Sequence, residues 1–157
     1  MRPLTLSIRG VNSFVQEETV DFTALTRHGF FGIFGETGSG KSTILDGITL
    51  ALYGKVARGG NNFINTGVAR AQVVFRFALS GHTRKVYRVR RSFKRDAALG
   101  TAQTDKCELY EESDADTPLA ENVREVNDRL REIVGLSYDD FTRTIVLPQG
   151  SFSDFLM

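Results

Sequence analysis

The residues with the clearest chemical potential form the segment Gly35–Thr43, whose sequence is GETGSGKST. Gly35, Gly40, Lys41 and Ser42 hold the fixed positions of the spacing G-x-x-x-x-G-K-[ST]. Glycines let the backbone wrap a phosphate with its N–H groups pointing inward, and a following helix adds its positive N-terminal end. Lysine supplies a mobile positive charge, and the serine hydroxyl is an oxygen ligand suited to Mg²⁺. The segment therefore predicts a site for a nucleoside triphosphate with Mg²⁺.

The flanking sequence is expected to place this loop between a strand and a helix. Phe30–Phe34 is a short apolar run with turn residues on both sides, which predicts a buried strand. From Ile44 to Tyr53 apolar residues recur at helical spacing, and Gly54 is expected to end that helix. The alternative is a glycine-rich turn that binds nothing, and the agreement of pattern and context argues against it. The predicted nucleotide-binding residues of the loop are Gly35, Glu36, Thr37, Gly38, Ser39, Gly40, Lys41, Ser42 and Thr43.

The remaining sequence predicts a mixed α/β fold with a substantial antiparallel part. Period-two alternation and turn residues predict strands at 4–8, 73–79, 85–93 and 107–111, and a hairpin return over 14–22. Helical periodicity predicts helices at 122–134 and 138–144, the second capped by Ser137. The apolar face of the first of these helices comprises Val123, Val126, Leu130 and Ile133. Glycine, asparagine and other polar residues predict loops over 55–71 and 94–105.

Composition indicates an ordinary soluble globular domain. The chain has 157 residues, of which 41% are hydrophobic and 25% charged, and its net charge of +1 gives no global attraction to nucleic acid or membrane. Cys107 is the only cysteine, which excludes an internal disulfide and fits a cytosolic protein. No signal peptide follows Met1, and no run reaches the roughly 18 apolar residues of a membrane span. His28 and His82 are interpreted as loop residues rather than metal ligands.

A local excess of positive charge lies in residues 84–95, which contain seven basic residues and no acidic one. In a strand over 85–93, one face would carry Arg84, Arg88, Arg90 and Lys94, and the opposite face would be apolar. Such a row suits the phosphate backbone of double-stranded DNA. The alternative is a solvated sheet face balanced by the acidic residues that follow in the sequence.

Three stretches together resemble the amino-terminal head segment of the SbcC family of SMC-like ABC ATPases. They are LSIRGVNSF with the nearby VDF, GETGSGKSTILDGITLALYG, and FTRTIVLPQGSFSDFL, so the resemblance runs from Leu4 to the last residue. It implies that Gln149 is the Q-loop glutamine, which binds Mg²⁺ and senses the γ-phosphate and the attacking water. It also implies that Asn12 and Ser13 lie near the phosphates and that residues 59–67 lie near the base. Without the resemblance, Gln149 would be interpreted as a solvated turn residue.

The resemblance implies ATP hydrolysis coupled to the processing of DNA ends and double-strand breaks. The implied partners are a carboxy-terminal ATPase lobe, a second head joined by ATP, an SbcD-type nuclease subunit and double-stranded DNA, in the bacterial cytoplasm at the nucleoid and not at a membrane. The family's Walker B pair, signature motif and switch histidine are not recognisable in this sequence. Residues 1–157 are therefore expected to form one lobe, ending where a coiled coil would begin, with little hydrolysis alone. The alternatives are a transporter ATPase subunit and a nucleotide-gated DNA-binding module without turnover.

Overall fold

The computed structural model describes residues 1–25, 32–57, 60–81, 83–112 and 117–144. The strands within these ranges are β1 (Arg2–Arg9), β2 (Glu18–Asp21), β3 (Arg70–Leu79), β4 (Lys85–Arg95) and β5 (Ala102–Glu111). The helices are α1 (Phe22–Leu25), α2 (Lys41–Tyr53), α3 (Val123–Val134) and α4 (Tyr138–Thr144).

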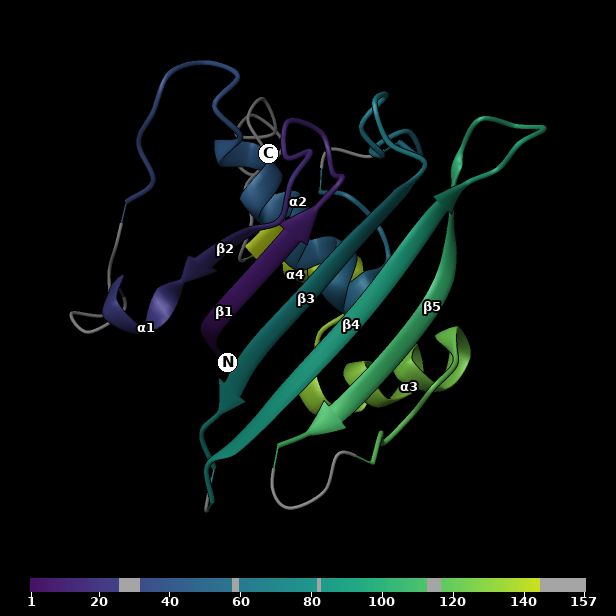
Figure 1. Ribbon diagram of the computed structural model, residues 1–157. Coiled ribbons are helices and arrows are strands. Elements are labelled where there is room, and N and C mark those ends of the chain that lie inside the picture. Colours follow the sequence, from purple (N-terminus) through teal and green to yellow (C-terminus); the bar gives the residue numbers. More distant parts are fainter. Residues whose placement is uncertain (26–31, 58–59, 82, 113–116, 145–157) are drawn as a thin grey trace, which may run out of the picture.

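The strands form one antiparallel sheet in the order β2-β1-β3-β4-β5. Figure 1 shows this sheet in front, with α2, α3 and α4 behind it, so that one face is covered by helices and the other faces outward. β3, β4 and β5 follow one another as hairpins, whereas α2 and the loops around it are inserted between β2 and β3. The predicted mixed α/β fold with a large antiparallel part is confirmed.

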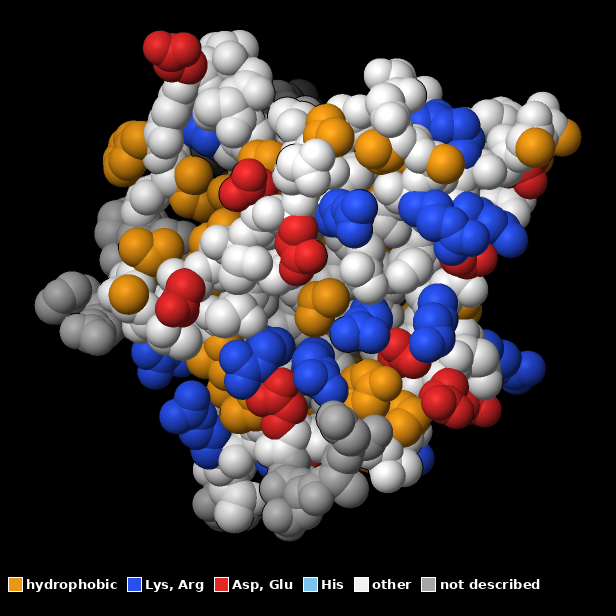
Figure 2. All heavy atoms as spheres, in the orientation of Figure 1, with side chains coloured by type: hydrophobic (Ala, Val, Ile, Leu, Met, Phe, Trp, Pro, Cys, Tyr) orange, Lys and Arg blue, Asp and Glu red, His pale blue; other side chains and the backbone are white. Residues whose placement is uncertain are grey.

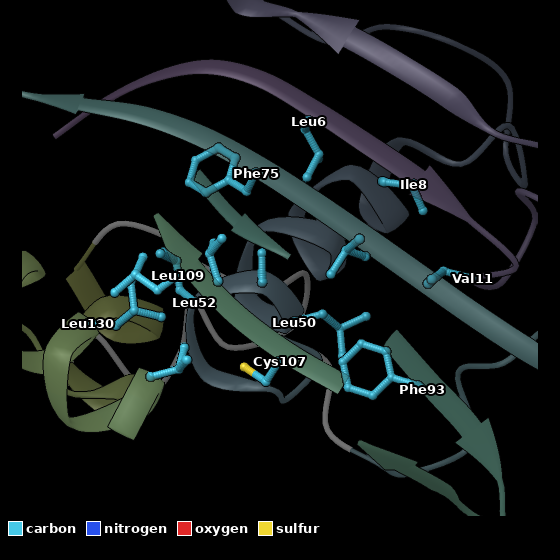
Figure 3. Packing of buried hydrophobic residues seen from close by; sticks show 14 of the residues in the cluster. Leu6, Ile8, Val11, Leu50, Leu52, Phe75, Phe93, Cys107, Leu109 and Leu130 are labelled. Atoms are coloured by element: carbon cyan, nitrogen blue, oxygen red, sulfur yellow. The ribbon is translucent and has the colours of Figure 1, made fainter. Parts of the chain in front are cut away.

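The core lies between the inner face of the sheet and the helices. On β3 the odd-numbered side chains Val73, Phe75 and Phe77 are fully buried, as their alternation predicts. Figure 3 shows this layer meeting side chains of α2 and α3. α2 lies very close to β1, because a Cβ atom at Gly47 would be 2.6 Å from Ile8 Cδ1. Each large apolar side chain buried here contributes about 1.5–3 kcal/mol, which fixes α2 firmly against the sheet.

The helix ends follow the sequence signals. Gly54, in the left-handed conformation, donates its N–H to Leu50 O and ends α2. Ser137 Oγ accepts from the Asp140 N–H at 3.1 Å and caps α4, as predicted. In α3, Val126 and Leu130 are buried, while Val123 at the first helical residue is 40% exposed.

The predicted strand at Phe30–Phe34 is wrong for its described part. Gly32–Phe34 has no strand structure, and the Phe34 side chain is 93% exposed. A buried strand requires hydrogen-bonded neighbours on both sides. In the described ranges, none of the five strands pairs with this segment. Apolar character alone therefore does not bring it into the sheet.

The predicted loop over 94–105 is too long, because β4 continues to Arg95 and β5 begins at Ala102, which leaves only residues 96–101 as a loop. Backbone pairing across the hairpin, with Lys94 opposite Gln103, sustains the strands although their side chains are polar. The turn between them is closed by Asp96, whose Oδ1 accepts from the N–H groups of Ala98 and Leu99.

The hairpin return predicted over 14–22 is shorter in the structure, where β2 covers only Glu18–Asp21. Asp21 Oδ1 accepts from the Thr23 N–H at 2.8 Å. This bond turns the chain out of the strand and into α1.

Candidate functional site: a phosphate loop and the turn behind it

The predicted phosphate loop forms an exposed turn that leads directly into α2. The Ser39 N–H donates to Glu36 O at 3.2 Å, and Gly38 and Gly40 have φ angles of 86° and 94°. Gly40 is the N-cap residue of α2, and none of the described side chains caps the helix there. Its carbonyl accepts from the N–H groups of Thr43 and Ile44 at 2.9 and 3.2 Å. The N–H groups at the start of α2 thus point toward the loop without a side-chain acceptor, an arrangement that fits a bound anion.

Lys41 lies across the mouth of this loop. Its Nζ donates to Gly35 O and to Glu36 O, both at 2.6 Å. The ammonium therefore lies against the backbone of the loop. Phosphate oxygens could replace the two carbonyls as its hydrogen-bond acceptors. Ser42 is half-buried beside it at the first turn of α2, and its hydroxyl is the candidate ligand for Mg²⁺. The residues present therefore fit a triphosphate with its metal ion.

Behind the loop lies a tight turn over residues 11–14, which carries the predicted phosphate neighbours Asn12 and Ser13. The Val11 and Phe14 backbones exchange hydrogen bonds at 3.1 and 2.9 Å. Asn12, with a φ angle of 46°, donates its side-chain amide to Asp46 Oδ2 at 3.2 Å. Ser13 is exposed. The structure thus brings the turn against the first half of α2 and directs the Asn12 amide to the buried carboxylate of Asp46.

A cleft of about 380 Å³ opens between this turn, α2 and the loop that follows α2. The loop side is anchored by Phe63, whose ring meets that of Phe93 on β4 edge-to-face with centroids 5.0 Å apart. Arg95 holds the same loop by donating to Ile64 O at 2.9 Å and to Asn65 O at 3.2 Å. The lining residues are Asn12, Asp46, Val56, Gly60, Asn61, Asn62 and Phe63.

The far end of α2 is held by a buried arginine. Arg91 on β4 is 1% exposed and donates from Nε to Ala51 O at 2.7 Å and from Nη2 to Leu52 O at 3.2 Å. It also donates to Asn127 Oδ1 on α3 at 2.6 Å. Burial lowers the pKa of this guanidinium, and the nearby thiol of Cys107 opposes the shift. Because the partners are mostly backbone carbonyls, Arg91 serves as a C-terminal cap for α2.

Two tyrosines connect α4 to the end of α2. The Tyr53 hydroxyl donates to Leu136 O at 3.2 Å, and burial raises its pKa to about 12. The Tyr138 hydroxyl donates to Val56 O at 2.7 Å, and burial likewise raises its pKa. These contacts fix the helix that immediately precedes the segment containing Gln149, which itself lies outside the described residues.

The outer face of the sheet carries the predicted basic row. Arg90 and Lys94 are exposed on β4 and Arg88 is half-buried, as the alternation predicts, while Arg84 precedes the strand. Figure 2 shows blue and red side chains interleaved on this face. Arg90 lies 3.8 Å from Glu108, Lys94 lies 3.4 Å from Asp105, and the Arg88 guanidinium stacks on Tyr110 at 4.6 Å. Acidic residues of β5 therefore balance much of the row.

Sequence reasoning missed four residues that hold the turn over residues 11–14 or α2 in place: Phe14, Asp46, Asn65 and Arg91. Asp46 left a signal, since it is an acidic residue within the apolar periodicity of α2. Arg91 left one as well, because its odd number places it on the apolar face of β4. Phe14 and Asn65 act through contacts with residues distant in sequence, which no local pattern reveals.

Comparison with known proteins is decisive for the family. A family model described as an AAA domain matches residues 5–157. The chain belongs to the AAA domain family. The predicted nucleotide-binding fold is thus confirmed at family level, as is the resemblance to SbcC. The chain is 49% identical over 157 residues to the C subunit of the nuclease SbcCD from Clostridium acetobutylicum, covering 99% of this chain and 14% of that protein.

Two further relatives show the same coverage. The C subunit of the nuclease SbcCD from Bacillus subtilis is 49% identical over 99% of the chain, and a probable DNA double-strand break repair Rad50 ATPase from Aquifex aeolicus is 38% identical over 99%. The chain spans 14% and 15% of their lengths, so it matches about one-seventh of each relative.

Among the described residues, no helix is long and apolar enough to cross a membrane.

Proposed function

We propose that this AAA domain chain is the ATP-binding, amino-terminal lobe of an SMC-like ATPase head that acts in the repair of DNA double-strand breaks. The observation that carries the proposal is the phosphate loop at the uncapped start of α2, with Lys41 across its mouth. The proposed role in DNA repair comes from the relatives, whose names refer to a nuclease subunit and to a double-strand-break repair ATPase.

The proposed roles of the loop residues rest on their types and spacing, and those of Gln149, Asn12 and Ser13 rest on the resemblance to the SbcC family. Backbone N–H groups of Gly35–Thr43 hold the phosphates, and Lys41 compensates charge on the β- and γ-phosphates. The hydroxyl of Ser42 and the amide of Gln149 would hold Mg²⁺, which supplies charge compensation between the phosphates when bound. Gln149 would also orient the attacking water, because a neutral amide can position water without taking its proton. Asn12 and Ser13 would approach the phosphates from the turn over residues 11–14.

Hydrolysis is expected to need a second lobe. Phosphoryl transfer requires several positioned groups around the γ-phosphate, and the family's Walker B and signature motifs are not recognisable in this sequence. We propose that a carboxy-terminal lobe completes the head, that ATP joins two heads, and that an SbcD-type nuclease subunit completes the complex.

The test is steady-state ATP hydrolysis by the chain alone and by the chain reassembled with the carboxy-terminal lobe of its own protein. Hydrolysis at least about a hundredfold faster in the reassembled head is expected, because removal of one group that stabilises the transition state costs about that factor. Equal rates would refute the division into lobes. ATP binding without turnover in the reassembled head would favour a nucleotide-gated module instead.

Double-stranded DNA is the proposed macromolecular ligand, bound on the outer face of the sheet by Arg84, Arg88, Arg90 and Lys94. Side chains at alternate positions of a strand are about 7 Å apart, close to the spacing of phosphates along one DNA strand. The acidic residues of β5 must be displaced or accommodated, since they already pair with Arg90 and Lys94. We therefore expect moderate, strongly salt-dependent affinity without sequence readout.

A further inference from the structure

The ring of Phe14 lies directly against the residue where the phosphate loop becomes a helix. A Cβ atom at Gly40 would lie 2.7 Å from both Cε1 and Cζ of Phe14, so the ring touches the Gly40 backbone. Gly40 is buried and has a φ angle of 94°, which a residue with a side chain rarely adopts. Glycine at this position thus serves two purposes, the left-handed turn and the close approach of an aromatic ring.

We propose that Phe14 is a positioning residue for the phosphate loop, which it supports through Gly40. The inference rests on the proposed nucleotide site and deepens it. From Gly35 to Ser39 the loop is exposed, and its described internal bonds are the Ser39–Glu36 turn and the two bonds from Lys41. Lys41 would exchange its two carbonyl acceptors for phosphate oxygens on binding. The direction of the N–H groups at the start of α2 must then be set from outside the loop, and the Phe14 ring is placed to do this.

The ring can act as a support because its own turn is fastened on two other sides. The Asn12 N–H donates to Phe63 O at 2.8 Å, and Asn65 Nδ2 donates to Asn12 O at 2.6 Å. On the other side, Asn12 Nδ2 donates to Asp46 Oδ2 on α2. The turn over residues 11–14 therefore joins the loop that lines the cleft to the helix that carries the phosphate loop. Phe14 is the part of this turn that reaches the phosphate loop itself.

The experiment compares the affinities of Mg–ATP and of Mg–inorganic triphosphate for the 157-residue chain by isothermal titration. Inorganic triphosphate is the informative probe, because it contains the phosphates without a base or sugar. Phe14→Ala removes the support, and we expect both ligands to bind about tenfold more weakly, since small misplacements of binding groups are costly. Phe14→Leu keeps an apolar side chain against Gly40 and should bind both ligands within about threefold of the unmodified chain.

The control is Leu79→Ala. Leu79 is a half-buried apolar residue packed against the same core, but it lies at the end of β3 paired near Arg2, at the opposite end of β1 from the turn. It should lower stability in urea unfolding without changing either affinity. If Phe14→Ala fails to fold, Phe14→Val makes the same test with a smaller truncation and an expected loss of about fivefold.

An equal loss for both ligands in Phe14→Ala, with near-normal binding in Phe14→Leu and Leu79→Ala, supports the proposal. A loss for ATP but not for triphosphate overturns it, because Phe14 would then contact the base or sugar. Unchanged affinities, or the same loss in Leu79→Ala, also overturn it. If the unmodified chain binds neither ligand, the nucleotide site itself is refuted, and that result is distinct from a failure confined to Phe14.

Discussion

Replacement of Lys41 by alanine should abolish most nucleotide binding and leave the fold intact. In the structure the Lys41 ammonium makes two hydrogen bonds of 2.6 Å to exposed backbone carbonyls, those of Gly35 and Glu36. A triphosphate would replace these neutral acceptors with charged oxygens. A hydrogen bond that involves a charged group contributes about 1.5–3 kcal/mol. The ammonium–carbonyl bonds have one charged partner and stand at the lower end of this range, whereas ammonium–phosphate bonds have two and stand at the upper end. At about 1–1.5 kcal/mol for each exchanged bond, two bonds favour binding by about 2–3 kcal/mol.

That difference corresponds to a loss of affinity of about 30- to 150-fold in Lys41→Ala. The effect on folding should be small, because the ammonium is exposed and its two bonds lie at the surface. We expect the free energy of unfolding in urea to change by less than about 1 kcal/mol. Isothermal titration with Mg–ATP, together with urea unfolding without nucleotide, measures both quantities.

Lys55→Ala is the matched control. Lys55 carries the same charge just beyond the other end of α2, where its ammonium lies 5.2 Å from the centroid of the Tyr138 ring. Its removal should change ATP affinity by less than about twofold, because screening weakens charge interactions over the length of the helix. An affinity of Lys41→Ala within about threefold of the unmodified chain would refute the assignment. An equal loss in Lys55→Ala would show that only overall charge matters.

Two further predictions concern β4. Arg91→Met should lower the free energy of unfolding in urea by about 1–3 kcal/mol, because it leaves buried carbonyls of α2 without their hydrogen-bond donor. Arg90→Met is the control at the exposed neighbouring residue, and it should change the free energy of unfolding by less than about 0.5 kcal/mol. Replacement of Arg88, Arg90 and Lys94 together by Glu should weaken the binding of duplex DNA to the reassembled head and reduce the slope of log affinity against log salt by up to about three. Glu108→Gln should strengthen DNA binding about threefold, because it releases Arg90 from an ion pair. Fluorescence anisotropy measures both affinities, and no change in either variant would contradict the DNA site.

Local sequence patterns predicted the elements whose structure depends on local rules. The phosphate loop followed from residue types at fixed spacing, and β3 and β4 followed from strict alternation on one buried face. The strand predicted at Phe30–Phe34 failed for its described part, residues 32–34, because an apolar run indicates that burial is favourable but not which strands could pair with it. The loop predicted over 94–105 was too long at both ends, because backbone pairing sustains strands whose side chains are polar.

The contacts that hold the turn over residues 11–14 in place could not be predicted from the sequence, for a different reason. Asn12 meets Asp46 across 34 residues and Asn65 across 53 residues, so the turn is assembled by contacts that have no sequence signature. The same holds for the contact of Phe14 with Gly40, which depends on the path of two separate loops. A single sequence identified the groups proposed to hold the phosphates, and the structure was needed to find what holds those groups in place.

The basic stretch shows how far a count of charges can mislead about function. Successive residues of β4 point to opposite faces of the sheet, so the basic side chains of the stretch lie on two different faces. Arg88, Arg90 and Lys94 lie on the outer face, whereas Arg91 binds the carbonyls at the end of α2 and Arg95 binds those of the loop beside the cleft. The guanidiniums of Arg91 and Arg95 already donate to these backbone carbonyls, so they cannot also neutralise DNA phosphates. The salt dependence of DNA binding should therefore reflect the outer residues and not all seven basic residues of the stretch.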